Sequence, residues 1–196
     1  MDANDLSLHF SSDREFDSQF PAYIKKLSEV HWTPLQVAFT AAKFLAPDAN
    51  ARIMDIGAGV GKFCMAGAWR NPGYFTGIEQ RKNFARIGNK VISKMGLTNA
   101  KIIHGNFLDL DLKEYTGIYF FNSFHENLVD SDALDHKIER SPELYAQYSL
   151  ALLERLKEMP SGTRLATYYL AITEVDKSYH LQTTHYGDLL KLWIKE

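Results

Sequence analysis

The chain has 196 residues, 45% hydrophobic and 23% charged, with a formal net charge of −2, so composition describes an ordinary folded domain with no overall attraction to nucleic acid. No apolar run approaches the ~20 residues of a membrane span, and the polar N-terminus lacks the basic and apolar regions of a signal peptide. Cys64 is the single cysteine, which excludes an internal disulfide and leads us to expect a reducing, cytoplasmic location.

The first 34 residues predict a helical cap, followed by the main domain at 35–196. Residues 1–12 are polar and expected to fray. Apolar residues recur at helical spacing over 13–30 and are interrupted by Pro21, which predicts one or two short helices. Thr33 and Pro34 then read as the N-cap and first position of a helix that stops near Pro47.

Residues 53–62 read as a buried strand that ends in a glycine-spaced turn and runs straight into a helix. Gly57, Gly59 and Gly61 allow positive φ and close approach of a ligand to the backbone. A dinucleotide-binding fingerprint would need its third glycine where this chain has Lys62. A phosphate-binding loop would need glycine at Ile56 and a hydroxyl at Phe63. Both motifs are therefore disfavoured.

The next predicted strand spans residues 74–78, and Glu79 stands at its carboxyl end. An acid about 20 residues beyond the glycines, at the end of the neighbouring strand, is placed to accept both hydroxyls of a ribose. The alternative is a solvated acid at the start of the following helix. That helix carries Lys82, Arg86, Lys90 and Lys94 at four-residue intervals, which we interpret as the solvated face of an amphipathic helix.

Two further buried strands are predicted at 100–104 and 117–121. The second delivers residues 122–126 to its carboxyl end, where ligands of open α/β sheets collect. His125 and Glu126 do not complete the zinc motif H-E-x-x-H, because Val129 stands where its second histidine belongs, so we expect no metal. A strand at 163–170 and an antiparallel pair at 179–184 and 187–195 follow a long helical pattern.

Residues 53–61 consist of two hydrophobic residues, Asp55, a hydrophobic residue and three glycines at alternate positions. This pattern resembles the cofactor-binding motif of class I S-adenosylmethionine-dependent methyltransferases. Their cofactor carries no phosphate, so it needs bare backbone and hydrogen-bond acceptors rather than cationic clamps. The resemblance implies a doubly wound α/β fold: a mostly parallel seven-stranded sheet with an antiparallel C-terminal strand. It also implies that Asp55, Gly57, Gly59, Gly61 and Glu79 bind the cofactor, with S-adenosylhomocysteine as the product.

The same resemblance assigns the adenine end of the cofactor to Asn106 and Phe107. The family more often has Asp at the Asn106 position, which leaves Asp109 as another acceptor. Thr33, in the corner formed by residues 31–34, either contacts the methionine tail or only starts a helix.

The sequence is also similar to histone-lysine methyltransferases of the disruptor-of-telomeric-silencing kind. The similarity rests on the fourth-strand motif at 121–124 and on the segments 55–61, 77–79 and 105–108. In that family the Asn and Phe border the lysine channel, and the similarity ends at 125–127. DNA amino-methyltransferases usually carry two prolines here, and this chain has neither.

The predicted activity is methyl transfer to an unidentified acceptor, a protein lysine or a small molecule. Catalytic candidates are Asn122, Phe124 and His125; Asn122 is also a cofactor candidate. The Asn122 amide either orients a nucleophile or caps the turn, and no spacing selects a base among His125, Glu126 and the tyrosines. A cofactor-binding but inactive scaffold remains the alternative, and an oxidoreductase is disfavoured by the missing glycine at 62.

Overall fold

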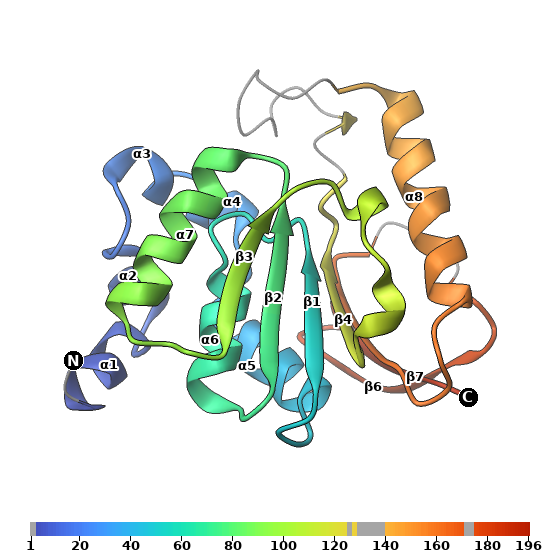
Figure 1. Cartoon of the computed structure of the whole chain (residues 1–196), viewed down its shortest axis with the longest axis horizontal. Coiled ribbons are helices and arrows are strands. Elements are labelled where there is room, and N and C mark those ends of the chain that lie inside the picture. Colours follow the sequence, from blue (N-terminus) through green and yellow to red (C-terminus); the bar gives the residue numbers. More distant parts are fainter. Residues whose placement is uncertain (1–2, 125–126, 129–139, 171–174) are drawn as a thin grey trace.

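The computed structural model describes residues 3–124, 127–128, 140–170 and 175–196. Its centre is a seven-stranded sheet with the order β3-β2-β1-β4-β5-β7-β6 (Figure 1). The strands are β1 (Arg52–Ile56), β2 (Tyr74–Glu79), β3 (Ala100–His104), β4 (Gly117–Phe121), β5 (Arg164–Tyr168), β6 (Tyr179–His185) and β7 (Leu190–Lys195). β1 to β5 are parallel, whereas β7 pairs antiparallel with β5 and β6 antiparallel with β7. The predicted fold class is confirmed.

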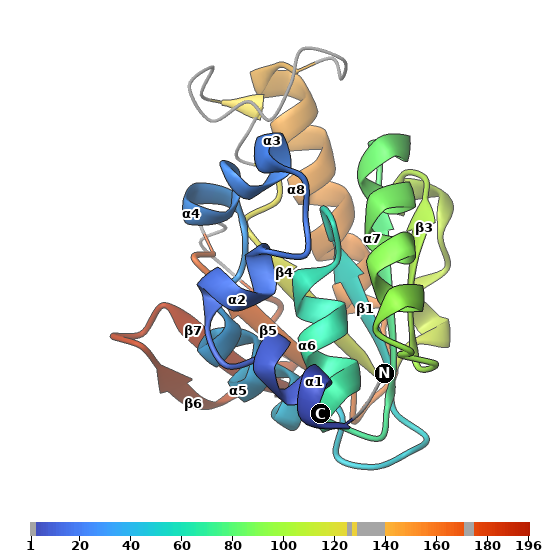
Figure 2. The same ribbon diagram turned by 90° about the vertical axis from the view of Figure 1, so that its left-hand side faces the viewer.

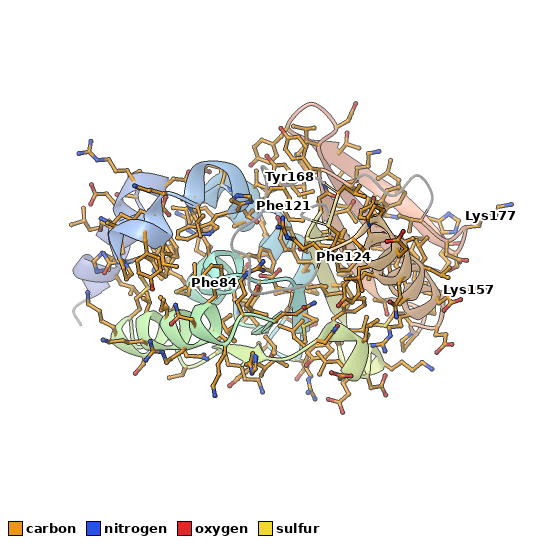
Figure 3. The ribbon with its side chains drawn as sticks, turned by 90° about the horizontal axis from the view of Figure 1, so that it is seen from above. Phe84, Phe121, Phe124, Lys157, Tyr168 and Lys177 are labelled. Atoms are coloured by element: carbon orange, nitrogen blue, oxygen red, sulfur yellow. The ribbon has the colours of Figure 1, made fainter. Side chains whose placement is uncertain are left out.

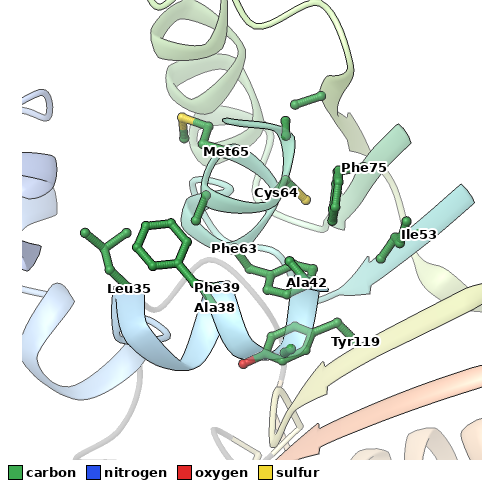
Figure 4. Close-up of a cluster of buried hydrophobic side chains, with 14 of the residues drawn as sticks. Leu35, Ala38, Phe39, Ala42, Ile53, Phe63, Cys64, Met65, Phe75 and Tyr119 are labelled. Atoms are coloured by element: carbon green, nitrogen blue, oxygen red, sulfur yellow. The ribbon is translucent and has the colours of Figure 1, made fainter. Parts of the chain in front are cut away.

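Helices cover both faces of this sheet. Alternate residues of β1 point to opposite faces, so Ile53 joins the hydrophobic cluster under α5 (Leu35–Leu45) and α6 (Lys62–Arg70), while Met54 joins the cluster under α8 (Pro142–Lys157). Figure 4 shows the first cluster, with Phe63 against Tyr119 between α6 and β4. α7 (Lys82–Lys94) packs its apolar stripe against the β2 and β3 side of the sheet. Two short 3₁₀ turns, Phe107–Asp109 and Leu112–Glu114, lead into β4.

The N-terminal cap is more ordered than the sequence predicts. It contains α1 (Ala3–His9), α2 (Asp13–Asp17), α3 (Ala22–Lys25) and α4 (Ser28–His31), and lies along the side of the sheet near α6 and α7 (Figure 2). The expectation of fraying over 1–12 is wrong for Ala3–His9, because the buried Phe10 ring stacks on Trp69 at 4.5 Å between centroids. Phe10, Phe16, Phe20 and Trp32 belong to the same core cluster as α5 and α6, and the boundary at residue 34 stays a prediction.

The start of α5 differs from the prediction by one residue. Pro34, with ψ of 142°, is the N-cap, and Thr33 is therefore not the capping residue. The free N–H of Leu35 instead donates to Asp13 Oδ1 at 3.0 Å, so a carboxylate from α2 supplies the cap from outside the helix.

The second difference lies at the carboxyl end of β5. The predicted strand at 163–170 shortens to Arg164–Tyr168, because Tyr169 adopts a left-handed φ of 51° and leaves the sheet. The terminal antiparallel pair is confirmed, with β7 starting at Leu190 rather than at residue 187, since Tyr186, Gly187 and Asp188 form a turn with positive φ.

Candidate functional site

A cavity of about 520 Å³ lies beyond the carboxyl ends of β1, β2, β4 and β5. The strand order reverses between β1 and β4, so the cavity occupies the switch point of the sheet, where open α/β sheets bind ligands. Its size falls within the range of small-molecule sites, about 300–1,000 Å³. It is lined by residues 31–34, 57–60, Asp55, Lys62, Phe63, Glu79, Arg81, Phe84, Tyr119, Phe121, Asn122, Ser123, Tyr168 and Tyr169. Figure 3 looks down onto this end of the sheet and labels Phe84, Phe121 and Tyr168.

The three predicted glycines have different roles in the turn. All adopt positive φ, 76° at Gly57, 57° at Gly59 and 85° at Gly61. A Cβ at Gly57 would lie 2.4 Å from Ser123 Cβ, and one at Gly61 would lie 2.5 Å from a methyl of Ile102. A Cβ at Gly59 would meet nothing within 4 Å. Gly57 and Gly61 therefore serve internal packing as well as the turn, whereas Gly59 presents bare backbone to open space.

Glu79 is 4% exposed, which is inconsistent with the solvated alternative. Its Oε2 accepts from the Gly59 N–H at 2.9 Å, and its Oε1 accepts from the Arg81 N–H at 2.8 Å and lies 3.6 Å from the Arg81 guanidinium. The carboxylate is thus fixed at the cavity wall, bonded directly to the glycine turn. A carboxylate has lone pairs beyond these bonds and can still accept from a ligand hydroxyl.

Asp55 lies in the floor of the cavity and is 4% exposed. Burial raises its pKa to about 8, with nearby Glu79 adding to the rise and a hydrogen bond from Cys64 Sγ at 3.6 Å opposing it. Cys64 is fully buried behind the turn, and the pKa of its thiol is also raised, chiefly by burial. Cys64 therefore packs behind the turn and donates to Asp55, and it is not placed as a reactive thiol.

The raised pKa of Asp55 makes stability depend on pH. The native protein keeps this proton up to about pH 8, whereas the unfolded chain releases it near the ordinary value of 3.8. Between those values the native state binds more protons, so the free energy of unfolding should fall as pH rises, by at most about 1.4 kcal/mol per pH unit from this group. In thermal denaturation experiments from pH 4 to 8, the Tm of Asp55→Asn should therefore fall less steeply with pH than the Tm of the wild type. Asp48→Asn, at an exposed site, should retain the steeper fall; equal slopes for wild type and Asp55→Asn would contradict the assignment.

Lys62 connects the glycine turn to the N-terminal cap. Its ammonium is buried, 2.7 Å from Asp13 Oδ1 and 2.9 Å from Asp17 Oδ1. It also lies over the rings of Phe16 and Trp32, at 5.4 and 5.6 Å from their centroids. Because Lys62 is the first residue of α6, this ion pair holds the cap beside the cavity.

Lys62→Met keeps the buried stem but leaves two carboxylates without their cation. Asp13 is 48% exposed and keeps the bond from the Leu35 N–H, so the loss falls mainly on Asp17, whose side chain is 14% exposed. Leaving a largely buried acceptor unsatisfied costs about 1–3 kcal/mol, so we expect the free energy of unfolding in urea to drop by about that amount. Restoring neutrality in Lys62→Met/Asp17→Asn should recover part of the loss. A double variant no more stable than the single one would show that the pairing is not the cause.

The corner formed by residues 31–34 lines the cavity, as the first of its two sequence interpretations requires. Thr33 Oγ1 and the Tyr119 hydroxyl lie 2.9 Å apart, and both are buried. Tyr119 stacks on Phe63 with centroids 3.9 Å apart, and burial raises the pKa of its hydroxyl well above the ordinary value. Thr33 is therefore held at the cavity by its hydrogen bond with Tyr119 of β4, and not by a capping bond at the start of α5.

Asn106 and Phe107 do not line the main cavity. The Asn106 amide oxygen accepts from the Leu108 N–H at 3.1 Å, and its nitrogen donates to the Tyr148 hydroxyl at 3.0 Å. Phe107 lines a smaller cavity of about 40 Å³, which shares Gly57, Glu79, Arg81 and Ser123 with the main one. The predicted adenine contacts therefore lie next to the cavity, beneath α8, and their role stays a prediction.

The catalytic candidates separate in space. Asn122 lines the main cavity with a left-handed φ of 38°, while Phe124 is buried, lines the smaller cavity and stacks with Phe107 at 5.2 Å. His125 lies outside the described residues. The left-handed conformation of Asn122 is uncommon for a residue other than glycine, and such residues cluster at functional sites.

Sequence reasoning missed Tyr168 and Tyr169 as cavity residues. β4 and β5 pair Phe121 with Tyr168, so the left-handed residues Asn122 and Tyr169 follow side by side at the ends of neighbouring strands. The Phe121 ring lies 4.8 Å from that of Tyr168 and 6.1 Å from that of Tyr169, which is half exposed. The available signal was that both tyrosines lie near the carboxyl end of the strand predicted at 163–170.

The described ranges hold neither a cluster of metal-ligand side chains nor a helix suited to a membrane span. No three His, Cys, Asp or Glu side chains gather there as they would around a metal ion. None of the helices in these ranges has the length and hydrophobicity that a membrane span requires.

Comparison with known proteins supports the fold. No family model matches the sequence, and no curated protein matches it. An RNA methyltransferase from Salinibacter ruber, solved with S-adenosyl-L-homocysteine, is 15% identical with a TM-score of 0.59, covering 83% of this chain and 90% of that one. The putative methyltransferase yhhF from Escherichia coli is 16% identical with a TM-score of 0.59, covering 82% and 85%. TrmN from Thermus thermophilus is 14% identical with a TM-score of 0.60, covering 88% of this chain but 52% of that one.

These similarities establish that the chain has the Rossmann-like fold of class I S-adenosylmethionine-dependent methyltransferases. The narrower resemblance to histone-lysine methyltransferases is not shown by them.

Proposed function

We propose that the protein is an S-adenosylmethionine-dependent methyltransferase. The observation that carries the proposal is the buried carboxylate of Glu79 bonded to the N–H of Gly59, the one glycine of the turn whose Cβ position faces open space. This arrangement combines an acceptor for sugar hydroxyls with bare backbone for an amino-acid tail at the switch point of the sheet.

The side chains in the cavity suit this cofactor better than a phosphate-bearing one. The two cations of the lining other than histidine, Lys62 and Arg81, are engaged with carboxylates, Lys62 with Asp13 and Asp17 and Arg81 with Glu79. Glu79 would hold the ribose, Gly57 and Gly59 would lie against the tail, and Asp55 and Thr33 would face its polar end. Asn106 and Phe107 would border the adenine beside the smaller cavity.

When bound, S-adenosylmethionine supplies a methyl group already activated on a sulfonium. The chain itself has to orient the acceptor and exclude water, and orientation alone can provide effective molarities of about 10⁵ M or more. Phe121 and Tyr168 wall the cavity with apolar rings, while the Asn122 amide has no hydrogen-bond partner among the described residues and can orient a nitrogen or oxygen nucleophile.

The acceptor enters beside Tyr169, the half-exposed aromatic of the lining. A lysine of a protein and a small-molecule nucleophile are the two acceptors we expect to approach the aromatic wall formed by Phe121, Tyr168 and Tyr169. The segment 121–124 resembles the fourth-strand motif of the histone-lysine methyltransferases, and this resemblance favours a lysine as the acceptor. The single, buried Cys64 is compatible with the cytoplasm as the compartment.

Ligand-induced stabilisation tests the proposal directly. S-adenosylhomocysteine at 100 times its Kd should add about 2.7 kcal/mol to stability and raise Tm, whereas nicotinamide dinucleotide should not. Glu79→Ala should lower the affinity by about tenfold or more, because hydrogen bonds to a charged group are lost. Glu154→Ala removes the same charge from an exposed position on α8 and should leave the shift intact. No shift in the wild type would overturn the proposal, whereas binding without transfer to any acceptor would favour the inactive scaffold.

Gly59→Ala isolates the bare backbone of the turn. Gly59 and Gly96 both have positive φ, 57° and 68°, and an added Cβ at either meets nothing within 4 Å. Both alanine variants should lose similar stability, about 1–2 kcal/mol, from the left-handed conformation. Gly59→Ala alone should weaken binding of S-adenosylhomocysteine in calorimetry, by about tenfold or more if its methyl meets the ligand, since roughly 1.4 kcal/mol corresponds to that factor. Equal binding by both variants would place the ligand elsewhere.

A further inference from the structure

The charge of this chain is unevenly distributed along its sequence. Residues 80–108 contain six Lys and Arg and no Asp or Glu. Four of the cations, Lys82, Arg86, Lys90 and Lys94, are exposed at four-residue intervals along α7. Successive members of this stripe are therefore about 6 Å apart along the helix axis, and the stripe is about 18 Å long.

No ion pair among the described residues neutralises a member of the stripe. Arg86 instead donates to Asn83, and Lys94 donates to Gln19. Like charges at i and i+4 destabilise a helix by a few tenths of a kcal/mol per pair. Three such pairs in succession are a cost to the fold that an anionic partner would remove.

The cap extends the basic surface. Gln19 contacts Lys94 near the end of α7, and the Tyr23 hydroxyl accepts from Asn83 at 3.3 Å near its start, so residues 19–23 run alongside the helix. Lys25, the last residue of α3, and Lys26, its C-cap, follow Tyr23 closely in sequence and are exposed. In Figure 1 α3 lies on the same side as the N-terminal end of α7, and the Asn83–Tyr23 hydrogen bond joins the two. Two of the three acids of α2, Asp13 and Asp17, are engaged with Lys62, and the third, Glu15, is half-buried on the same short helix.

Tyr23 adds an aromatic face to this surface, since it is 56% exposed. The stripe also begins at the cavity: Arg81 and Phe84 line it, and Lys82 lies between them in sequence. A partner lying along α7 would therefore reach the mouth of the cavity with one end.

We propose that α7 and α3 form a binding surface for single-stranded nucleic acid, consisting of Tyr23, Lys25, Lys26, Lys82, Arg86, Lys90 and Lys94. Regularly spaced cations beside an exposed aromatic ring are the features that single-strand binding uses, with phosphates on the cations and a base on the ring. A duplex hides the faces of its bases, and an acidic peptide has no need of the ring. The surface does not depend on the proposed methyl transfer, and neither finding requires the other.

Fluorescence anisotropy with a labelled 12-residue oligouridylate tests this surface on the whole chain. Six engaged cations predict a slope of about −4 for log K against log salt, and therefore roughly 250-fold weaker binding at 200 than at 50 mM. The variant Lys82→Gln/Arg86→Gln/Lys90→Gln should reduce the slope to about −2. Its matched control, Lys43→Gln/Lys157→Gln/Lys177→Gln, removes three exposed cations from other regions and should keep the steep slope; Lys157 and Lys177 lie at the far end of the molecule in Figure 3. Equal slopes for the two variants would overturn the proposal.

Tyr23 distinguishes a single strand from other polyanions. Tyr23→Ala should weaken oligouridylate binding about fivefold or more, and Tyr23→Phe should not, because stacking needs the ring rather than the hydroxyl. Equal affinity for polyglutamate or for a 12-base-pair duplex would exclude the single-strand assignment. S-adenosylhomocysteine should stabilise both triple variants like the wild type, so loss of nucleic-acid binding and failure of the methyltransferase proposal remain separable.

Discussion

The end of β2 holds the glycine turn that follows β1. The carbonyl of Ile78 accepts from the N–H groups of both Gly57 and Ala58, at 3.0 and 2.9 Å, and the side chain of Glu79 accepts from Gly59. Three consecutive donors of a turn that could not otherwise satisfy them are thereby bound by two residues of the neighbouring strand. The floor and one wall of the cavity are consequently a single unit, and a change at Glu79 acts on the turn as well as on any ligand.

The central part of the fold could be predicted because its signals are local. Strands β1 to β4 are short apolar runs bounded by turn residues, and their limits were predicted to within a residue. The glycines and Glu79 follow from spacing within one βαβ unit, since the carboxyl ends of β1 and β2 must be adjacent once the strands pair, whereas Asp55 was assigned by the family resemblance.

The remaining features depend on contacts that are distant in sequence. Asp13 caps α5 from 22 residues away, Phe10 is ordered by Trp69, and Asn106 is engaged by Tyr148 from α8. No window of sequence contains both partners of such a pair. Tyr169 leaves the sheet through a left-handed φ, a conformation that bulky residues adopt only where surrounding structure imposes it.

Net charge was a poor guide to the surface for a related reason. A value of −2 is a sum over the chain, whereas a partner interacts with charges within about a Debye length, roughly 10 Å. The acids that neutralise the sum include Asp109, Asp111 and Glu114, which lie in the segment between β3 and β4 and not on α7. The composition therefore argues against a general attraction to nucleic acid and leaves a local basic surface possible.

The N-terminal cap consists of four short helices whose stability depends on contacts with the rest of the protein. Helices of four to seven residues have no stability of their own, since nucleation is unfavourable at that length. The cap is instead ordered by burial of Phe10, Phe16 and Phe20 and by the ammonium of Lys62. Because Lys62 starts the helix after the glycine turn and Thr33 follows the last turn of the cap, a ligand on the turn contacts the elements that order the cap. Any coupling between ligand binding and order of the cap would be reciprocal, because linkage gives each the same effect on the other.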